Sequence, residues 1–507
     1  MLWQLFLMCT LVWLLVVRWQ NRGKRAMAKS LRNDLDTLPF LGISHKFIGS
    51  DEDRMTTLSE IAADCNRHDG ITAVWLANRI FVVITDPVEA EAVLKNCLEK
   101  DNILRFVRTL TGNGSIFAPV SIWRPRRKVL APTFGLRNLN QFVNVFSEQS
   151  NIMADRLAEA SDKGTFSIWK YMTSYTMDSV CETTMGTKLG IQKQDNHPFL
   201  ANFERFTELV TARTLMPWLH TDFVYKFTPY YKKNTEIVNY MTSFVTKIIK
   251  EKRKDIEDGS NKKNAIDEQN NDTGRPATKT FLELLIDYSG GDKGYTNLEL
   301  QEETMVMLLA GTDTSAVGAS FVMVMLSKHQ DVQEKLFQEL LEVLGDEERP
   351  VTAEDLPRFK YLDAVVKETL RLYPPVPITA RTTDKDYVLP SGKKIVKGTG
   401  VIIHIWGTHR NPKYWGPDVD VFRPERFLDL QLAHPAAYMP FSHGPRNCLG
   451  YQYATMSMKT AIATLVRRYK VVPAEHIVQD GEKPLRVKFD IMMKHVDKFQ
   501  IQLVRRK

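Results

Sequence analysis

The sequence has few cysteines. It holds five in 507 residues, and none of them stands in a C-x-x-C pair. Cysteines scattered in this way argue against a disulfide framework and against the paired ligands of a structural zinc site. Any metal-binding role for Cys448, which lies in the segment FSHGPRNCLG over residues 441–450, must therefore be that of a single ligand.

Basic residues are missing before the apolar run that opens the chain. Residues 1–17 carry no charge, whereas five basic residues lie between positions 18 and 29. This order fits a cleaved signal peptide poorly, although residues 26–28 offer small side chains for cleavage. We therefore expect a transmembrane signal anchor over residues 1–19 and a basic flank and linker over 20–45, with the remainder in the cytosol by the positive-inside rule.

The net charge of +8 comes without any nucleic-acid-binding motif. No zinc-finger spacing, helix-turn-helix pattern or aromatic RNA platform accompanies the basic residues, many of which gather in the N-terminal flank, at 124–128 and at 505–507. We therefore expect no nucleic-acid partner. A membrane surface or an acidic protein explains the charge more simply.

Apolar spacing predicts a mainly helical protein with small β-sheets. Alternating residues over 71–87 predict a β-hairpin turning at 77–78, and two further strand groups follow over 387–406 and 485–504. Helical spacing dominates between 88 and 385, with a capping box at Thr296 and Glu299 before a helix over 298–327. A charged, Asn-rich stretch over 252–280 predicts an exposed, mobile loop. The fold class is α+β, in one large domain over 46–507.

Four segments in fixed order resemble one family. They are AGTDTS at 310–315, ETLR at 368–371, FRPERF at 422–427 and FSHGPRNCLG at 441–450. Together they resemble the signatures of the cytochrome P-450 haem-thiolate monooxygenases, of the microsomal type and most similar to the animal family-four clan that includes insect members. The resemblance implies the cytochrome P-450 fold and a single-pass protein of the endoplasmic reticulum membrane with its catalytic domain in the cytosol.

The cysteine segment is implied to bind the cofactor, haem b. By this resemblance Cys448 is the iron ligand, since a thiolate favours O–O cleavage over reversible dioxygen binding. Arg446 is expected to pair with a haem propionate, and glycines to let the backbone turn tightly beside the porphyrin. The alternative is a buried, inert cysteine. The other expected cofactor-binding positions in this frame are Phe441, Gly444 and Gly450.

The long helix is implied to carry the proton-delivery residues. Ala310, Gly311 and Thr314 share one stripe of the helix by their spacing. The resemblance implies that the small residues open room beside the helix and that Thr314 and Asp313 deliver protons for dioxygen activation. The alternative is a stripe that only allows close packing, with the Thr314 hydroxyl bonded to a backbone carbonyl.

A buried ion-pair network is implied near the cysteine segment. Glu368 and Arg371 lie three residues apart and face the same way on a helix. The family places such a pair with the arginine of the P-x-R segment, here Arg426, in a structural network that holds the cysteine loop. A solvated pair on a helix surface is the alternative.

The resemblance also implies further residues that contact the haem and a surface that binds the electron donor. Trp123, Arg127 and Arg381 are expected to reach the propionates. NADPH–cytochrome P-450 reductase is the expected partner through which NADPH supplies electrons, with cytochrome b5 as a second candidate. The remaining basic residues of the 124–128 segment form its expected docking face, or else an ordinary solvated helix face: Arg124, Arg126 and Lys128.

The predicted reaction inserts one oxygen atom from dioxygen into a lipophilic substrate, such as a fatty acid, hormone, terpenoid or xenobiotic. A haem-thiolate isomerase or dehydratase acting on peroxides and a non-catalytic haem or lipid carrier are the alternatives. The intact Asp313–Thr314 pair argues against the isomerase. Many family-four members join a glutamate to the haem through an ester at the position of Ala310. A methyl side chain cannot form that ester, so we expect haem held non-covalently apart from the Cys448–iron bond.

Overall fold

The structure is a computed structural model that describes residues 8, 19, 21–38, 41–76, 79–194, 196–258, 279–289, 294–346, 348–429, 431–481 and 483–506. The predicted anchor over 1–19 lies outside the described residues, apart from two isolated positions, and so does the hairpin turn at 77–78. Among the described helices, only α14 (Asn297–Lys328) is long and apolar enough to cross a membrane. Because 78% of its apolar window is buried inside the protein, α14 is a core helix.

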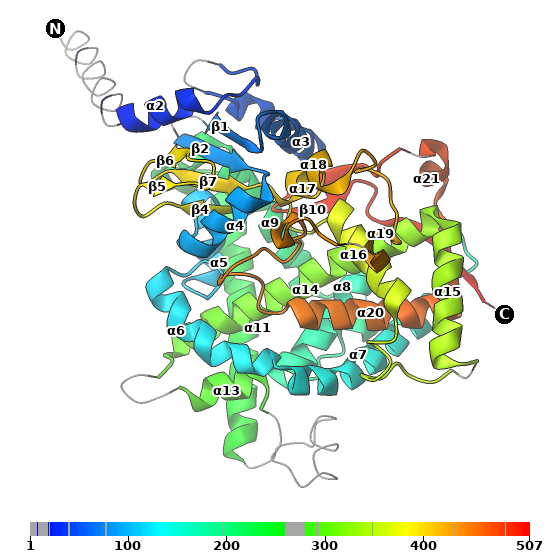
Figure 1. The fold of residues 1–507 in the computed structure, drawn as a ribbon. Coiled ribbons are helices and arrows are strands. Elements are labelled where there is room, and N and C mark those ends of the chain that lie inside the picture. The colour runs from blue at the N-terminus through cyan, green and yellow to red at the C-terminus, as the bar shows by residue number, and fades with distance from the viewer. Residues whose placement is uncertain are drawn as a thin grey trace. The chain divides into compact units, whose positions relative to one another are not determined.

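The chain forms two compact units. The first, here called the sheet unit, comprises Met1–Asp101, Ile378–Val419 and Leu432–Asn447. The second, the helical unit, comprises Asn102–Pro377, Asp420–Gln431 and Cys448–Lys507. Figure 1 shows the elements of both units as a ribbon.

A four-stranded sheet organises the sheet unit. Its order is β1 (Ile71–Leu76), β2 (Arg79–Ile84), β7 (Gly400–Ile403) and β4 (Thr379–Thr382). β1 and β2 pair antiparallel with Ile71 opposite Ile84, which confirms the two strands of the first predicted hairpin. β2 then runs parallel to β7, and β4 antiparallel to it. Branched residues point from these strands into a buried core, so burial on the sheet explains their β-rich composition.

Short helices and a small hairpin complete the sheet unit. α4 (Pro87–Asn96) begins directly after β2, with Asp86 capping its N-terminus and proline at its first position. The hairpin of β5 (Tyr387–Val388) and β6 (Lys394–Ile395) confirms the predicted second strand group, with Gly392 and Gly398 at positive φ in its turns. The other described helices of the unit are α2 (Arg22–Ser30), α3 (Asp51–Arg67), α17 (Ile405–Thr408) and α18 (Pro412–Trp415).

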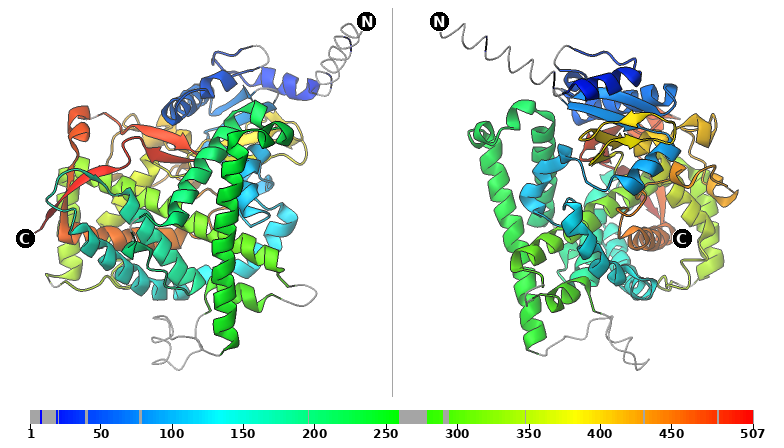
Figure 2. Two further views of the ribbon diagram at one scale, coloured as in Figure 1. Left: turned by 180° about the vertical axis from the view of Figure 1, so that it is seen from behind. Right: turned by 60° about the vertical axis from the view of Figure 1, so that its left-hand side comes forward.

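Helix α14 is the centre of the helical unit. The predicted capping box is present: the Thr296 side chain accepts from the Glu299 N–H, and Glu299 accepts from the Thr296 N–H. The helix is apolar on most sides because it is surrounded by α8 (Trp169–Val180), α11 (Pro229–Glu257), α16 (Lys360–Leu372) and α20 (Tyr451–Arg468). Figure 2 shows α11 as the long green helix.

The remaining described helices of this unit pack around that centre. They are α5 (Arg108–Thr111), α6 (Val120–Leu130), α7 (Leu136–Leu157), α9 (Pro198–Leu215), α10 (Asp222–Lys226), α13 (Phe281–Asp287), α15 (Gln330–Leu344), α19 (Arg426–Asp429) and α21 (Glu475–Asp480). Its strands form two small sheets. β3 (Phe166–Ser167), β11 (Gln500–Arg505) and β8 (Tyr469–Pro473) make one, and β9 (Val487–Asp490) with β10 (Met492–His495) makes the other.

Two predicted boundaries are wrong in detail. The predicted loop over 252–280 begins too early, because α11 continues to Glu257 and the Lys252 side chain is buried against Glu283, with Nζ 2.5 Å from Oε1. The C-terminal strands do form a hairpin, β9 with β10. However, the last strand, β11, is not part of this hairpin. It pairs with β8 and β3, and these strands set its register.

Candidate active site

Cys448 differs from the other described cysteines in its accessibility. Its side chain is exposed just before α20, whereas Cys65, Cys97 and Cys181 are buried. Burial raises the pKa of Cys65 to about 12 and that of Cys97 to about 11, which keeps these thiols protonated and unreactive. Among the described cysteines, Cys448 is therefore the one whose sulfur is available to a ligand.

The backbone before Cys448 requires one glycine of its motif. Gly444 has φ of +74°, and a Cβ there would lie 2.6 Å from the Leu94 carbonyl oxygen. Gly450 does not fit the expectation of a tight turn, because its φ is −94° and the nearest atom to a Cβ would be 3.8 Å away. Any residue can adopt that conformation. Of these two glycines, Gly444 is therefore the one that the backbone conformation and packing require.

The predicted stripe of α14 is open on one side. Met307, Ala310, Gly311 and Thr314 are half-buried, whereas almost every other residue in the middle of this helix is buried. Space therefore lies beside this stripe. Gly311 has a different function from Ala310, since a Cβ at 311 would lie 2.7 Å from Val180 of α8. Glycine at 311 permits close helix packing, which corrects the prediction that both small residues open room.

Thr314 and Asp313 make different contacts. The Thr314 hydroxyl donates to the Ala310 carbonyl oxygen at 2.6 Å, the local bond named above as the alternative. Asp313 is buried, and its Oδ2 lies 3.5 Å from Lys494 Nζ. Adjacent side chains on an α-helix point about 100° apart, so the two residues face different surroundings. The structure does not join them by a hydrogen bond within the described chain.

Glu368, Arg371 and Arg426 are brought together in the interior of the helical unit. Arg371 donates to both carboxylate oxygens of Glu368, from Nε at 2.7 Å and from Nη2 at 2.8 Å, and both side chains are fully buried. Arg426 Nε lies 3.5 Å from Glu368 Oε1, and the Arg423 N–H donates to the same oxygen at 3.1 Å. This bidentate pair is the strong form of a carboxylate–guanidinium contact.

Two buried guanidinium groups in the sheet unit are suited to an anion. Arg381 is fully buried, and its Nε and Nη2 have no hydrogen-bond partner among the described residues. Burial, and then the charge of nearby Arg446, lower the pKa of Arg381 to about 10. Arg446 is 6% exposed and donates to the Leu98 carbonyl oxygen at 3.0 Å. Two neighbouring buried cations are costly unless an anion binds them, and a propionate has the required charge.

Helix α6 carries the other predicted cofactor residues. Trp123 is 6% exposed, and Arg127 is half-buried on the same helix. Burial lowers the pKa of Arg127, and the charge of Cys448 opposes that effect, so these two residues lie near each other in the helical unit. Phe441, in the sheet unit, is half-buried in the cysteine segment.

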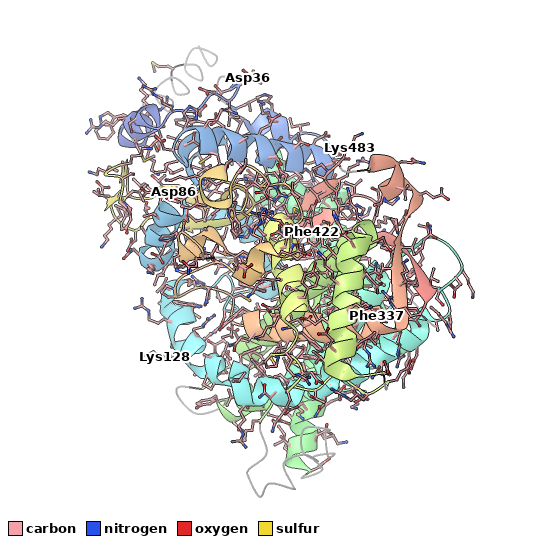
Figure 3. All side chains as sticks on the ribbon, turned by 45° about the vertical axis from the view of Figure 1, so that its right-hand side comes forward. Asp36, Asp86, Lys128, Phe337, Phe422 and Lys483 are labelled. Carbon is pink, nitrogen blue, oxygen red and sulfur yellow. The ribbon has the colours of Figure 1, made fainter. Side chains whose placement is uncertain are left out.

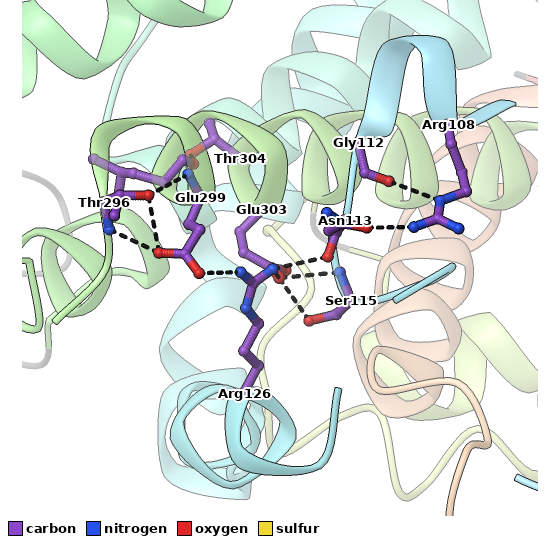
Figure 4. A network of polar contacts seen from close by, with 10 residues as sticks. Arg108, Gly112, Asn113, Ser115, Arg126, Thr296, Glu299, Glu303 and Thr304 are labelled. Atoms are coloured by element: carbon purple, nitrogen blue, oxygen red, sulfur yellow. Dashed lines mark hydrogen bonds and ion pairs between the residues drawn. The ribbon is translucent and has the colours of Figure 1, made fainter. Parts of the chain in front are cut away.

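The prediction that Arg126 belongs to an exposed docking face is wrong. Its side chain is 6% exposed and donates to Glu303 Oε1 and Glu299 Oε1, each at 2.7 Å (Figure 4). Ser115 also donates to Glu303, through its N–H at 3.0 Å and its hydroxyl at 2.8 Å. Arg126 thus joins α6 to α14. The spacing of Glu299 and Glu303, four apart on one helix face, was the signal that sequence reasoning missed.

Arg124 and Lys128 remain exposed on α6, and Lys128 is labelled in Figure 3. Each lies two positions from Arg126, about 200° around the helix from it, so these two side chains face solvent where Arg126 faces inward. The exposed part of the predicted docking face is therefore smaller than the sequence suggested.

Comparison with known proteins identifies the family. A family model described as Cytochrome P450 matches residues 35–501. The chain belongs to the cytochrome P450 family. It is 34% identical over 415 residues to "Cytochrome P450 4d8" of Drosophila melanogaster, covering 79% of this chain and 88% of that protein. It is also 34% identical over 414 residues to "Cytochrome P450 4V2" of Mus musculus, covering 80% and 77% respectively.

Membership in the P450 family defines the enzyme class and the cofactor. The protein is a haem-thiolate monooxygenase, and its cofactor is haem b, held by a cysteine thiolate and otherwise non-covalently. The described residues fit this group: the helical unit offers an accessible thiol and an open helix stripe, and the sheet unit offers two buried guanidinium groups.

Proposed function

We propose that this P450 uses Cys448 as its haem ligand and oxygenates a lipophilic substrate with electrons from NADPH delivered by NADPH–cytochrome P450 reductase. The observation that carries the proposal is the exposed Cys448 thiol, alone among the described cysteines in being accessible. When bound, the haem supplies the iron at which dioxygen is activated. A thiolate ligand favours O–O cleavage by donating electron density.

The chain's own residues hold the cofactor and handle protons. Arg381 and Arg446 are the proposed propionate partners in the sheet unit, and Trp123 and Arg127 in the helical unit. Arg371, paired with Glu368, also donates to the Val421 carbonyl oxygen at 3.3 Å. This network with Arg426 is the proposed structural support of the cysteine segment. Thr314, with its hydroxyl on the open stripe of α14, is the proposed proton donor of the site.

Neither Ala310 nor the two acids of α14 described above, Glu303 and Asp313, offers the haem a free carboxylate. Ala310 has only a methyl group, Glu303 is bound to Arg126 and Ser115, and Asp313 is paired with Lys494. These contacts support a haem that is free of a protein ester. Without that link, and with an open stripe at Ala310 and Met307, the site does not restrict oxygenation to a terminal methyl group of the substrate.

An exposed aromatic patch supports residence at the endoplasmic reticulum membrane. Trp218, Phe223 and Phe227 are 59%, 71% and 78% exposed, and Lys226 stands among them at the end of α10. Aromatic residues beside lysine are typical of surfaces that sit at the bilayer interface. This patch, together with the apolar residues 1–17, supports a single-pass protein whose catalytic domain lies in the cytosol.

The test of this function is turnover with purified components. The protein, NADPH and the reductase are incubated with fatty acids, terpenoids, steroids and insecticide-like aromatics, after a spectral screen has shown which of them bind near the haem. We expect an oxygenated product that requires both NADPH and reductase, with one oxygen atom from labelled dioxygen. Conversion of a preformed peroxide without NADPH would instead indicate an isomerase or dehydratase.

A further inference from the structure

The cysteine segment contains two residues in the left-handed backbone region. Ser442 has φ of +62° and Gly444 has φ of +74°, and His443 lies between them. A left-handed conformation at a residue with a side chain, such as Ser442, is strained and persists only where the surrounding structure holds it. The backbone that leads to Cys448 therefore depends on contacts that fix its conformation.

Helix α4 and the residues after it lie beside this segment in the sheet unit. Gly444 is so close to α4 that a Cβ there would be 2.6 Å from the Leu94 carbonyl oxygen. Arg446 donates to the Leu98 carbonyl oxygen at 3.0 Å, two residues after α4 ends. The later residue of the segment thus contacts the later residue of the α4 region. The two stretches of chain therefore run side by side in the same direction.

A side-chain hydrogen bond joins the same two stretches of chain one helical turn before Leu94. His443 Nε2 lies 2.9 Å from Glu91 Oε1, and since an ionised carboxylate only accepts, the histidine donates. The bond from Lys95 lowers the pKa of Glu91, and the bond from His443 adds to this effect while burial opposes it. Glu91 is therefore ionised at neutral pH. The side chains of Glu91 and His443 are 24% and 27% exposed, so water screens their bond only in part.

The other carboxylate oxygen of Glu91 faces a second segment of the sheet unit. His434 Nε2 lies 3.8 Å from Glu91 Oε2. His434 Nδ1 accepts from the Ala436 N–H at 3.2 Å, at the start of a short 3-10 helix over Pro435–Ala437. In the neutral ring the proton is therefore on Nε2, the atom that faces Glu91. Glu91 thus contacts both ends of residues 434–443, the stretch that leads into the cysteine motif.

We propose that Glu91 is a positioning residue for the haem-thiolate site, and that through His443 it holds the backbone that carries Cys448. The proposal rests on the function proposed above, in which Cys448 binds the haem iron. It adds to the four sequence motifs a residue of α4 that lies 352 positions before His443. Both residues act through the conformation of the segment, so no chemical step is assigned to either of them.

The test compares variants of the whole purified haem protein by the red-shifted absorption band of its reduced, carbon-monoxide-bound form, which reports thiolate ligation. In Glu91→Ala and in His443→Ala this band should disappear about threefold to tenfold faster than in the natural protein, because one partly shielded hydrogen bond is lost. The rate is measured at a temperature where far-ultraviolet circular dichroism shows no unfolding. Hydrogen exchange of the backbone amides over residues 441–447 should become faster in the same variants, which reports on the segment directly.

A double-mutant cycle separates this coupling from two independent packing effects. The double variant Glu91→Ala with His443→Ala should lose the band no faster than the faster single variant, since either change removes the same bond. His443→Gln should restore the natural rate, because its amide N–H can donate to Glu91 in place of Nε2. Glu60→Ala is the matched control in the same unit. It breaks a partly exposed pair with Lys46 and should leave the rate unchanged.

The outcomes distinguish this proposal from the proposed function. Natural rates in the alanine variants, additive effects in the double variant, or an equal effect of Glu60→Ala would overturn the proposal. An alanine variant that fails to bind haem is replaced by His443→Asn, whose side chain is too short to reach Glu91, and the same criteria apply. Absence of the red-shifted band from the natural protein would instead refute the proposed function, and hydrogen exchange over 441–447 would still test the bond between Glu91 and His443.

Discussion

Two buried acid–base pairs of the helical unit are built in opposite ways. Glu368 accepts two hydrogen bonds from Arg371, of 2.7 and 2.8 Å. Arg426 and the Arg423 N–H contact the same carboxylate. Among the described residues, Asp313 has one ion pair, of 3.5 Å with Lys494 on β10. The charge of Lys494 is also influenced by Asp490 and Glu204. A bidentate guanidinium fixes geometry, whereas a single shared ammonium leaves the acid able to change charge. We infer that the first pair maintains structure, whereas the second leaves Asp313 able to gain or lose a proton.

The largest expected effect comes from breaking the rigid pair. Glu368→Gln removes the buried carboxylate charge that Arg371 and Arg426 share, so the free energy of unfolding should fall by about 3–5 kcal/mol. Denaturant unfolding of the purified protein measures it, and haem content should fall in parallel. Glu251→Gln, which breaks an exposed pair with Lys247 on α11, is the control and should cost less than about 0.5 kcal/mol. Equal losses in the two variants would contradict the claim that the buried Glu368 pair stabilises the fold more than an exposed pair does.

Glu303→Gln should have an intermediate effect. Arg126 keeps its contact with Glu299 in this variant, so its charge is still compensated. We expect a loss of about 1–3 kcal/mol in the free energy of unfolding, from the weakened hydrogen bonds of a buried group. A loss as large as that of Glu368→Gln would mean that the Arg126 network is as rigid as the Glu368 network.

Asp313→Asn should change stability little near neutral pH but alter its pH dependence. Burial raises the pKa of Asp313, so the native state holds a proton that the unfolded chain has released, and stability falls as pH rises from the ordinary carboxyl range through the raised pKa. Without the carboxyl group this slope should be reduced. Melting temperatures measured from pH 4 to pH 9 test it, and an unchanged slope would show that Asp313 does not titrate in that range.

Thr314→Ala should have the smallest effect on stability. Among the described residues its hydroxyl bonds only the Ala310 carbonyl of its own helix, and alanine is the better helix former. We expect less than about 1 kcal/mol of change and an unaltered haem spectrum. Product formed per NADPH should nevertheless drop, with peroxide or water formed instead. Full coupling in Thr314→Ala would remove this hydroxyl from proton delivery.

Local patterns in the sequence predicted much of this structure. The capping box of Thr296 and Glu299, the i,i+3 spacing of Glu368 and Arg371, and the alternating strands β1 and β2 all depend on near neighbours. The spacing of Glu299 and Glu303 marks a helix face that suits a cation, but it does not say which one, because Arg126 lies more than 170 residues earlier. The contact of Gly311 with Val180 and that of Lys494 with Asp313 depend in the same way on tertiary packing.

The central claim, that Cys448 is the haem ligand, is tested most directly by the absorption spectrum of the reduced, carbon-monoxide-bound protein. A thiolate opposite carbon monoxide shifts the Soret band to longer wavelength, and we expect this band in the natural protein and in Cys97→Ser, which alters a buried cysteine. Cys448→Ser should abolish it. A red-shifted band retained in Cys448→Ser would contradict the assignment.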